Sequence, residues 1–185
     1  MTRTLVFGGA RSGKSAHAES LAAASGKEVV YIATADAGDA EMQARIARHR
    51  EQRDPQWTTV EARLALGHAI GAWSAPHRLV LVDCLTVWLS NLLFSQPATY
   101  PDVGRIQPPP AFATQRATLL HALEHAAGDI LLVSNEVGMG IVPQGAVSRW
   151  FVDEAGRLNQ AVAARCDRVA WVAAGLPLML KGGPC

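Results

Sequence analysis

Eight residues near the N-terminus combine glycines with a lysine and a serine in an order that suits a polyphosphate. They read GGARSGKS, which fits the pattern GxxxxGK[ST], and they lie between a short apolar run and a helix-capable segment. In this setting, successive backbone N–H groups and the positive end of the helix face the phosphates of a nucleotide. The predicted nucleotide-binding residues of this P-loop are Gly8, Gly9, Ala10, Arg11, Ser12, Gly13, Lys14 and Ser15.

Two side chains of the P-loop have separate expected roles. Lys14 reaches the β- and γ-phosphates, and the hydroxyl of Ser15 holds Mg²⁺. P-loop enzymes also need a carboxylate on the metal side, and Asp83 directly follows the apolar run at residues 79–82. Asp83 is therefore the second predicted metal ligand. Its structural alternative is to cap the helix that follows, because Asp is a favourable N-cap residue.

A histidine lies among arginines in residues 41–53, which read EMQARIARHREQR. On a helix, Arg45, His49 and Arg53 share one face, because they are spaced four residues apart. Such a face suits a polyphosphate. Neighbouring cations disfavour the imidazolium form, which leaves the ring neutral and nucleophilic near neutral pH. His49 is a candidate catalytic nucleophile, and the alternative is a solvated side chain on a charged helix.

A polar pair, Asn135 and Glu136, follows the apolar run at residues 130–133. Open α/β sheets bind ligands at the carboxyl ends of their strands, so this pair could position a substrate hydroxyl, a water or the metal. Gly138 and Gly140 allow a close approach of the backbone. Asn135 and Glu136 are therefore candidate substrate residues, and the alternative is a tight glycine turn.

The elements that must position these residues alternate between short apolar runs and longer helix-capable segments. This pattern predicts one α/β domain over residues 1–185, P-loop NTPase-like, with a mostly parallel sheet and helices on both faces. Strands are expected at residues 4–7, 29–32, 79–82, 130–133 and 169–172, with an edge strand at 57–60. Helices are expected at residues 14–24, 40–52, 63–73, 85–94, 111–127 and 146–165.

One segment, residues 95–110, carries five prolines and is predicted to be a long irregular loop. It is either functional or a variable surface insertion.

Charge and composition exclude several partners. The 17 basic and 16 acidic residues nearly balance, which argues against a nucleic acid or an anionic membrane surface as the partner. No apolar run approaches the roughly 20 residues that a membrane span needs. Three widely spaced cysteines suit neither a disulfide framework nor a zinc site. We expect a cytoplasmic protein with reduced thiols.

The chain resembles a known family, the bifunctional adenosylcobinamide kinase and adenosylcobinamide-phosphate guanylyltransferase of cobalamin biosynthesis. The resemblance covers nearly the whole chain, and the segment SNEVGMGIVP at residues 134–143 is its most specific mark. Its other marks are GGARSGKS at 8–15, YIATA at 31–35, EMQARIARHR at 41–50, WTTVEA at 57–62, VDCLTVWLSNLL at 82–93 and GRLNQ at 156–160.

This resemblance implies two successive reactions. First, the terminal hydroxyl of adenosylcobinamide accepts the γ-phosphoryl group of ATP or GTP. Then the histidine that matches His49 attacks the α-phosphorus of GTP, releases pyrophosphate and holds GMP until adenosylcobinamide phosphate accepts it, giving adenosylcobinamide-GDP. A covalent intermediate of this kind divides one difficult displacement into two easier ones.

The resemblance also implies a homotrimer and further guanine-nucleotide contacts. The residues concerned, besides the P-loop, are Thr34, Ala35, Asp36, Arg50, Glu51, Gln52, Arg53, Glu61 and Asp83. The structural alternatives are a strand-to-helix turn at residues 34–36 and a helix start at Glu61.

Two other functions stay open on the residues alone. One is a single-activity P-loop kinase for a small molecule, in which His49 and its arginines only clamp phosphates. The other is a nucleotide-gated binding module, in which the P-loop controls a partner interaction. The segment SNEVGMGIVP at a strand end favours a small-molecule site.

Overall fold

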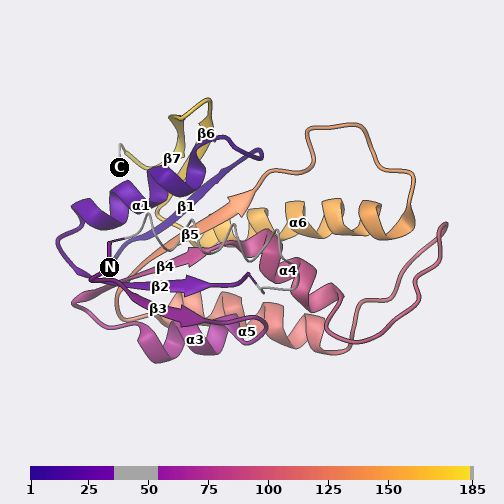
Figure 1. Cartoon of the computed structure of the whole chain (residues 1–185), viewed down its shortest axis with the longest axis horizontal. Coiled ribbons are helices and arrows are strands. Elements are labelled where there is room, and N and C mark those ends of the chain that lie inside the picture. Colours follow the sequence, from indigo (N-terminus) through magenta and orange to yellow (C-terminus); the bar gives the residue numbers. More distant parts are fainter. Residues whose placement is uncertain (36–53, 184–185) are drawn as a thin grey trace.

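The computed structural model describes residues 1–35 and 54–183. In this part of the chain, one seven-stranded sheet has the strand order β3-β2-β4-β5-β1-β6-β7 (Figure 1). Every pairing is parallel except that of β7, which runs antiparallel to β6. The strands are β1 Arg3–Gly8, β2 Glu28–Ala33, β3 Thr58–Glu61, β4 Arg78–Asp83, β5 Asp129–Asn135, β6 Arg168–Ala173 and β7 Leu176–Lys181.

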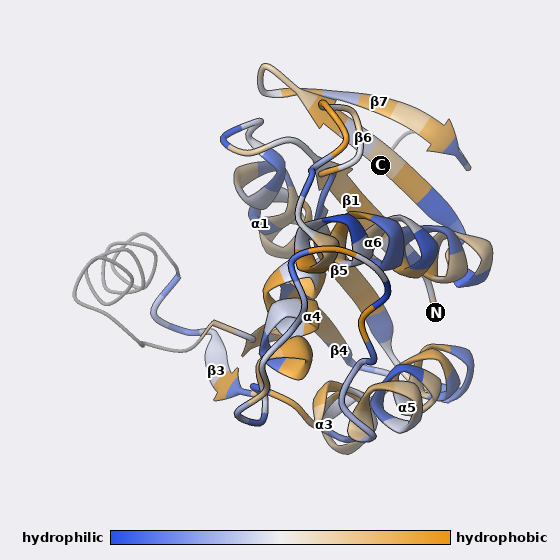
Figure 2. Cartoon of the chain, turned by 90° about the vertical axis from the view of Figure 1, so that its right-hand side faces the viewer, coloured by the Kyte–Doolittle hydropathy of each residue, from blue (hydrophilic) through white to orange (hydrophobic). Residues whose placement is uncertain are grey.

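Helices cover both faces of this sheet. They are α1 Lys14–Ala24, α3 Leu66–Trp73, α4 Leu85–Leu93, α5 Ala111–His125 and α6 Ala146–Arg165. Figure 2 shows α1 on one side of the sheet and α5 and α6 on the other. No helix in the described ranges is long and apolar enough to cross a membrane.

The central strands are mainly apolar because both of their faces are buried. Alternate residues point to opposite faces of a strand. In β1, Leu5 belongs to the core beneath α3, α4, α5 and α6, whereas Val6 belongs to the core beneath α1. Ala18 and Ala22 of α1 complete the second core. The prediction of a mostly parallel sheet with helices on both faces is confirmed.

The predicted runs match the observed elements closely, and one observed strand was not predicted. The predicted edge strand at residues 57–60 is β3, at one edge of the sheet. Strand β7 was not predicted, although Ala174 and Gly175 have φ angles of 51° and 79° and connect it to β6. Two residues with positive φ are typical of a tight hairpin turn. The helix predicted at residues 40–52 lies outside the described residues.

The proline-rich segment at residues 95–110 contains no helix or strand, as predicted, but it packs against the start of α6. Its Ile106 is buried with Leu93 and Ala146. The backbone N–H of Ala146 donates to the carbonyl oxygen of Asp102 at 3.0 Å. The loop therefore fixes the point at which α6 begins.

Candidate active site

The P-loop connects β1 to α1 at the carboxyl edge of the sheet. A Cβ atom on Gly8 would lie 2.2 Å from the carbonyl oxygen of Val172, so β6 leaves no room for a side chain there. Gly13 has a φ of 93° and is the N-cap of α1, without a side-chain hydrogen bond to the helix. The first N–H groups of α1 thus have no capping side chain, which suits a bound anion.

One side chain inside the loop is buried, and the hydroxyl oxygen of another is buried. Lys14 is 8% exposed, and its Nζ donates to the carbonyl oxygen of Gly9 at 3.1 Å. The ammonium group is therefore folded back over its own loop. Ser12 Oγ is buried and has no hydrogen-bond partner among the described residues. A buried hydroxyl without a partner is costly, and a phosphate oxygen would satisfy it.

The turn between β6 and β7 supports the P-loop from outside. Gly175 N–H donates to the carbonyl oxygen of Ser12 at 2.8 Å. A Cβ atom on Gly13 would lie 2.9 Å from Gly175 Cα, so the two backbones are in close contact. Sequence reasoning missed this contact, and the signal that could have revealed it is the pair Ala174 and Gly175 between two apolar runs.

Asp83 ends β4, two strands away from the P-loop strand. Its Oδ2 accepts a hydrogen bond from Tyr31 Oη at 3.1 Å. The N-cap of α4 is Cys84, whose Sγ accepts from Val87 N–H at 3.5 Å. The capping alternative for Asp83 is therefore wrong, since the neighbouring thiol takes that role and leaves the carboxylate at the sheet edge.

Strand register gathers the predicted site residues along one edge. Ala33 is level with Glu61 of β3 on one side and with Asp83 of β4 on the other. On the P-loop strand, Gly8 is level with Asn135 of β5. Because β5 lies between β4 and β1, the Asn135 position separates Asp83 from the P-loop.

Thr34 is fully buried and fixes the turn after β4. Its Oγ1 donates to the carbonyl oxygen of Cys84 at 2.9 Å and accepts from Cys84 N–H at 2.9 Å. Ala35 is half-buried beside it. The remaining predicted residues of this group lie outside the described residues: Asp36, His49, Arg50, Glu51, Gln52 and Arg53.

A buried polar network holds the end of β5. Ser134 Oγ donates to Asn159 Oδ1 at 2.6 Å, and Asn159 Nδ2 donates to the carbonyl oxygen of Asn135 at 3.3 Å. The side chain of Asn135 in turn donates to Thr86 Oγ1 at 2.7 Å. These bonds connect α6, β5 and α4 directly behind the sheet edge.

Sequence reasoning gave Asn159 no role, although it lies in the family-like segment GRLNQ. The available signal was its position on α6. Ala155, Leu158 and Val162 are buried, so Asn159 is a polar residue within an apolar stripe. Such a residue requires a hydrogen-bond partner in the core.

Glu136 both follows β5 and closes the turn after it. Its N–H donates to the carbonyl oxygen of Gly8 at 2.9 Å, which holds the chain beside β1. Its Oε1 accepts from Gly138 N–H at 2.5 Å. The tight turn is therefore present, and it places a half-buried carboxylate next to the strand that leads into the P-loop.

The described cysteines are free and buried, and burial raises the pKa of both thiols. For Cys84 the nearby Asp83 carboxylate adds to this increase in pKa. For Cys166 burial raises the pKa to about 12. Both thiols stay protonated near neutral pH, so neither is an activated nucleophile. Cys185 lies outside the described residues.

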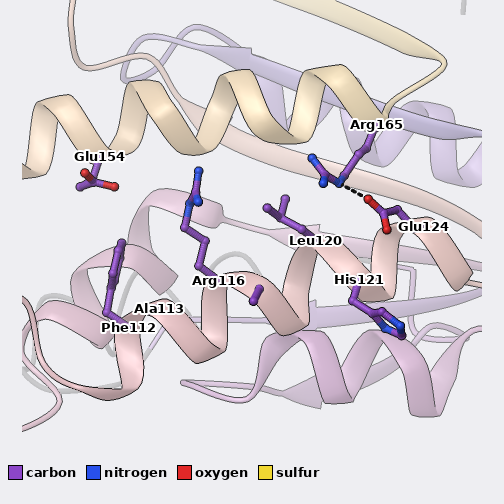
Figure 3. A pocket seen from close by; sticks show the side chains of 9 residues that line it. Phe112, Ala113, Arg116, Leu120, His121, Glu124, Glu154 and Arg165 are labelled. Carbon is purple, nitrogen blue, oxygen red and sulfur yellow. Dashed lines mark hydrogen bonds and ion pairs between the residues drawn. The ribbon is translucent and has the colours of Figure 1, made fainter.

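A cavity of about 390 Å³ lies elsewhere, between α5 and α6 (Figure 3). Arg165 Nε lies 2.7 Å from Glu124 Oε1, and Glu154 pairs with Arg157. Figure 3 shows Arg116 pointing from α5 toward α6 between these carboxylates. None of the predicted site residues in the described part of the chain lines this α5–α6 groove.

Two solved structures with a similar fold are ATPases. The ATPase EscN of the type III secretion system of enteropathogenic E. coli matches with a TM-score of 0.55 and 16% identity, over 94% of this chain and 43% of that chain. A prototypical type III secretion ATPase matches with a TM-score of 0.55 and 15% identity, over 96% of this chain and 56% of that chain. This chain thus spans well under two thirds of either ATPase, and the likeness concerns the fold alone.

Comparison of sequences identifies relatives more specifically than comparison of folds. The bifunctional adenosylcobalamin biosynthesis protein CobP of Pseudomonas aeruginosa is 50% identical over 182 residues, which are 98% of this chain and 99% of that protein. The bifunctional adenosylcobalamin biosynthesis protein CobU of Escherichia coli K12 is 42% identical over 179 residues, which are 96% and 98% of the two chains.

A family model described as cobinamide kinase / cobinamide phosphate guanyltransferase matches residues 4–180. This description names two activities. The two alternatives that the residues alone left open, a single-activity kinase and a nucleotide-gated binding module, do not account for both. The resemblance seen in the motifs is confirmed: the chain belongs to the bifunctional cobinamide kinase and cobinamide phosphate guanylyltransferase family of adenosylcobalamin biosynthesis.

Proposed function

We propose that one domain with one P-loop carries out both reactions of this family. The chain phosphorylates the terminal hydroxyl of adenosylcobinamide with ATP or GTP, and then transfers GMP from GTP to adenosylcobinamide phosphate. The observation that supports this most directly is the P-loop itself, where α1 begins without a capping side chain and Ser12 Oγ is buried without a partner among the described residues.

In the first reaction, the hydroxyl oxygen of adenosylcobinamide attacks the γ-phosphorus, and the bond from that phosphorus to the bridging oxygen breaks. ADP or GDP leaves. Lys14 and the N–H groups at the start of α1 stabilise the charge on the phosphates. We assign Asn135 and Glu136 to the acceptor side, because Asn135 ends the strand between Asp83 and the P-loop and Glu136 directly follows it. Glu136 is our candidate to accept the hydroxyl proton.

Ser15 and Asp83 are the residues that would hold Mg²⁺. A hydroxyl and a carboxylate are oxygen donors of the kind that this ion prefers, so both side chains would suit it. The structure fits this donor set, because Asp83 is not used as a helix cap. When bound, Mg²⁺ neutralises charge on the triphosphate.

In the second reaction, His49 attacks the α-phosphorus of GTP. A nitrogen–phosphorus bond forms and pyrophosphate leaves. A phosphate oxygen of adenosylcobinamide phosphate then attacks the same phosphorus, and the bond to His49 breaks. We propose that the guanine nucleotide is also contacted by Thr34, Ala35, Asp36, Arg50, Glu51, Gln52, Arg53 and Glu61. Family membership supports these assignments, and Glu61 is at the same sheet edge as Asp83.

The decisive experiment uses GTP labelled at the α-phosphorus. The wild-type protein should acquire the label in a bond that is labile in acid and comparatively stable in base, as expected of a phosphoramidate. His49→Ala should acquire none while corrinoid phosphorylation stays measurable, because only the second reaction needs a protein nucleophile. His121→Ala, at an exposed position on α5, is the matched control and should label normally.

Label that persists on the His49→Ala protein would assign the nucleophile to another residue. A wild-type adduct that survived acid but not alkali would do the same.

We also propose a cytoplasmic homotrimer, on the basis of the family resemblance. Light scattering should give three times the mass of one chain, and a monomeric mass at working concentration would refute this assembly.

A further inference from the structure

The loop after β5 exposes apolar side chains at an unusual density. Val137, Met139, Ile141 and Val142 are 36%, 77%, 98% and 74% exposed. Single exposed apolar residues are normal on protein surfaces, but a concentrated group marks an interaction site. We call these four residues the apolar loop.

The apolar loop is held at both ends. On one side, Glu136 N–H donates to the carbonyl oxygen of Gly8 at 2.9 Å. On the other side, Arg149 Nη1 donates to the carbonyl oxygen of Pro143 at 3.4 Å, and α6 is fixed through Ala146. Figure 1 shows this segment leaving the end of β5 and returning to α6. Its apolar side chains therefore project from a fixed base instead of filling a core.

The position at which the apolar loop is fixed indicates which part of the substrate it would contact. Gly8 is the last residue before the P-loop turn, so the apolar loop begins beside the site of phosphoryl transfer. The hydroxyl that accepts the phosphoryl group lies at the end of a side chain on a corrin macrocycle. This macrocycle is too large to enter the P-loop and carries methyl groups around its rim. When the hydroxyl reaches the γ-phosphate, the macrocycle must lie against the surface just beyond the carboxyl edge.

We propose that the apolar loop binds the corrin macrocycle of the substrate and so determines specificity for a corrinoid acceptor. This inference rests on the proposed function, because the substrate and the shared P-loop come from it. Burial of Met139 and Ile141 against the methyl-bearing rim supplies affinity for the acceptor and leaves the nucleotide contacts unchanged.

The test is the double variant Met139→Ser/Ile141→Ser. The KM for adenosylcobinamide in the kinase reaction should rise by about tenfold or more, because two large apolar contacts are lost. The kcat and the Kd for GTP measured without corrinoid should stay within about twofold, since uniform binding energy affects KM alone. The thermal midpoint Tm should not change, because both side chains are exposed.

A matched control is Leu180→Ser in β7. Leu180 is 56% exposed, but it precedes Lys181, which pairs with Val169 at the far end of β6 from the P-loop. This variant should keep the wild-type KM. An unchanged KM in the double variant overturns the proposal. So does a change of molecular mass in light scattering, because the apolar loop would then be a contact between copies of the chain.

Direct binding separates this inference from the proposed reaction. The visible absorbance of adenosylcobinamide allows its binding to be followed by equilibrium dialysis without turnover. If the wild type binds it and the double variant does not, the inference holds even where no phosphorylation is detected. If wild type and variant bind it equally, or if neither binds it, the inference is wrong.

Discussion

The carboxyl edge of the sheet and the α5–α6 groove both contain partly buried polar groups, but they use them differently. In the groove, opposite charges face one another, as Arg165 and Glu124 do at 2.7 Å. At the edge, polar side chains such as Thr34 and Asn159 donate to backbone carbonyl oxygens, those of Cys84 and Asn135. Their bonds fix the strand ends, and Ser12 Oγ stays without a partner within the described residues.

The difference teaches that a cavity alone does not identify a site. The groove contains a cavity of about 390 Å³, but charged residues that line it are paired, as Arg165 is with Glu124 and Glu154 is with Arg157. The edge is built from satisfied groups that hold donors in place for a ligand. Arg116 is the ambiguous residue, because its Nε is buried without a partner among the described residues. Substitutions at the two regions can therefore test the comparison directly.

The largest effect is expected for Lys14→Ala, compared with Arg116→Ala. Removing Lys14 should lower both kinase and guanylyl transfer by about a hundredfold or more, because in the proposed function both reactions use the same preorganised phosphate cradle. Arg116→Ala should leave both rates within about twofold, as expected for a residue outside the site. The measurement is the steady-state rate of each reaction. Near-normal rates for Lys14→Ala, or a large loss for Arg116→Ala, would reverse the assignment of the two regions.

A smaller effect on turnover, which depends on the Mg²⁺ concentration, is expected for Asp83→Asn. The amide keeps the size of the side chain and its hydrogen bond with Tyr31 but loses the charge that we propose balances the metal. Turnover should fall by about tenfold or more at low Mg²⁺ and recover in part as Mg²⁺ is raised. A Mg²⁺ titration of kinase activity measures this. The same curve for variant and wild type would remove Asp83 from the metal site.

The smallest effect is expected for Asn159→Leu, which removes the partner of Ser134 and of the Asn135 carbonyl. Leaving these buried groups unsatisfied should cost about 1–3 kcal/mol of unfolding free energy, measured in urea. The kcat should fall severalfold while Gln160→Ala, at an exposed neighbouring position, changes neither quantity. Full stability and kcat in Asn159→Leu would show that the edge does not depend on the network behind it.

The sequence predicted the parts of the fold that have a strong local signal. The runs around Val6, Val80 and Leu131 are strands buried on both faces, so their continuous apolar character was informative. Strand β7 was missed because it is an edge strand with exposed leucines and an internal Pro177, which argues against a central strand.

The candidate site could be proposed from the sequence only where residue type and spacing carry the chemistry. The P-loop has a motif with a physical reason for each position, and Asp83 ends an apolar strand. The role of Asn159 depends on a helix crossing behind β5, and no local pattern specifies that partner. The capping role of Cys84 was hidden for a similar reason, since cysteine is not a preferred N-cap residue.

The strand order also affects the stage of folding at which the protein becomes able to bind a nucleotide. Strand β1 pairs only with β5 and β6 in the described sheet, and both lie beyond residue 128. During synthesis, β2, β3 and β4 can pair with one another while β1, made first, waits for its neighbours. Pairings of such long sequence separation form slowly. Nucleotide binding should therefore appear among the last events of folding, after most of the helical content is already in place.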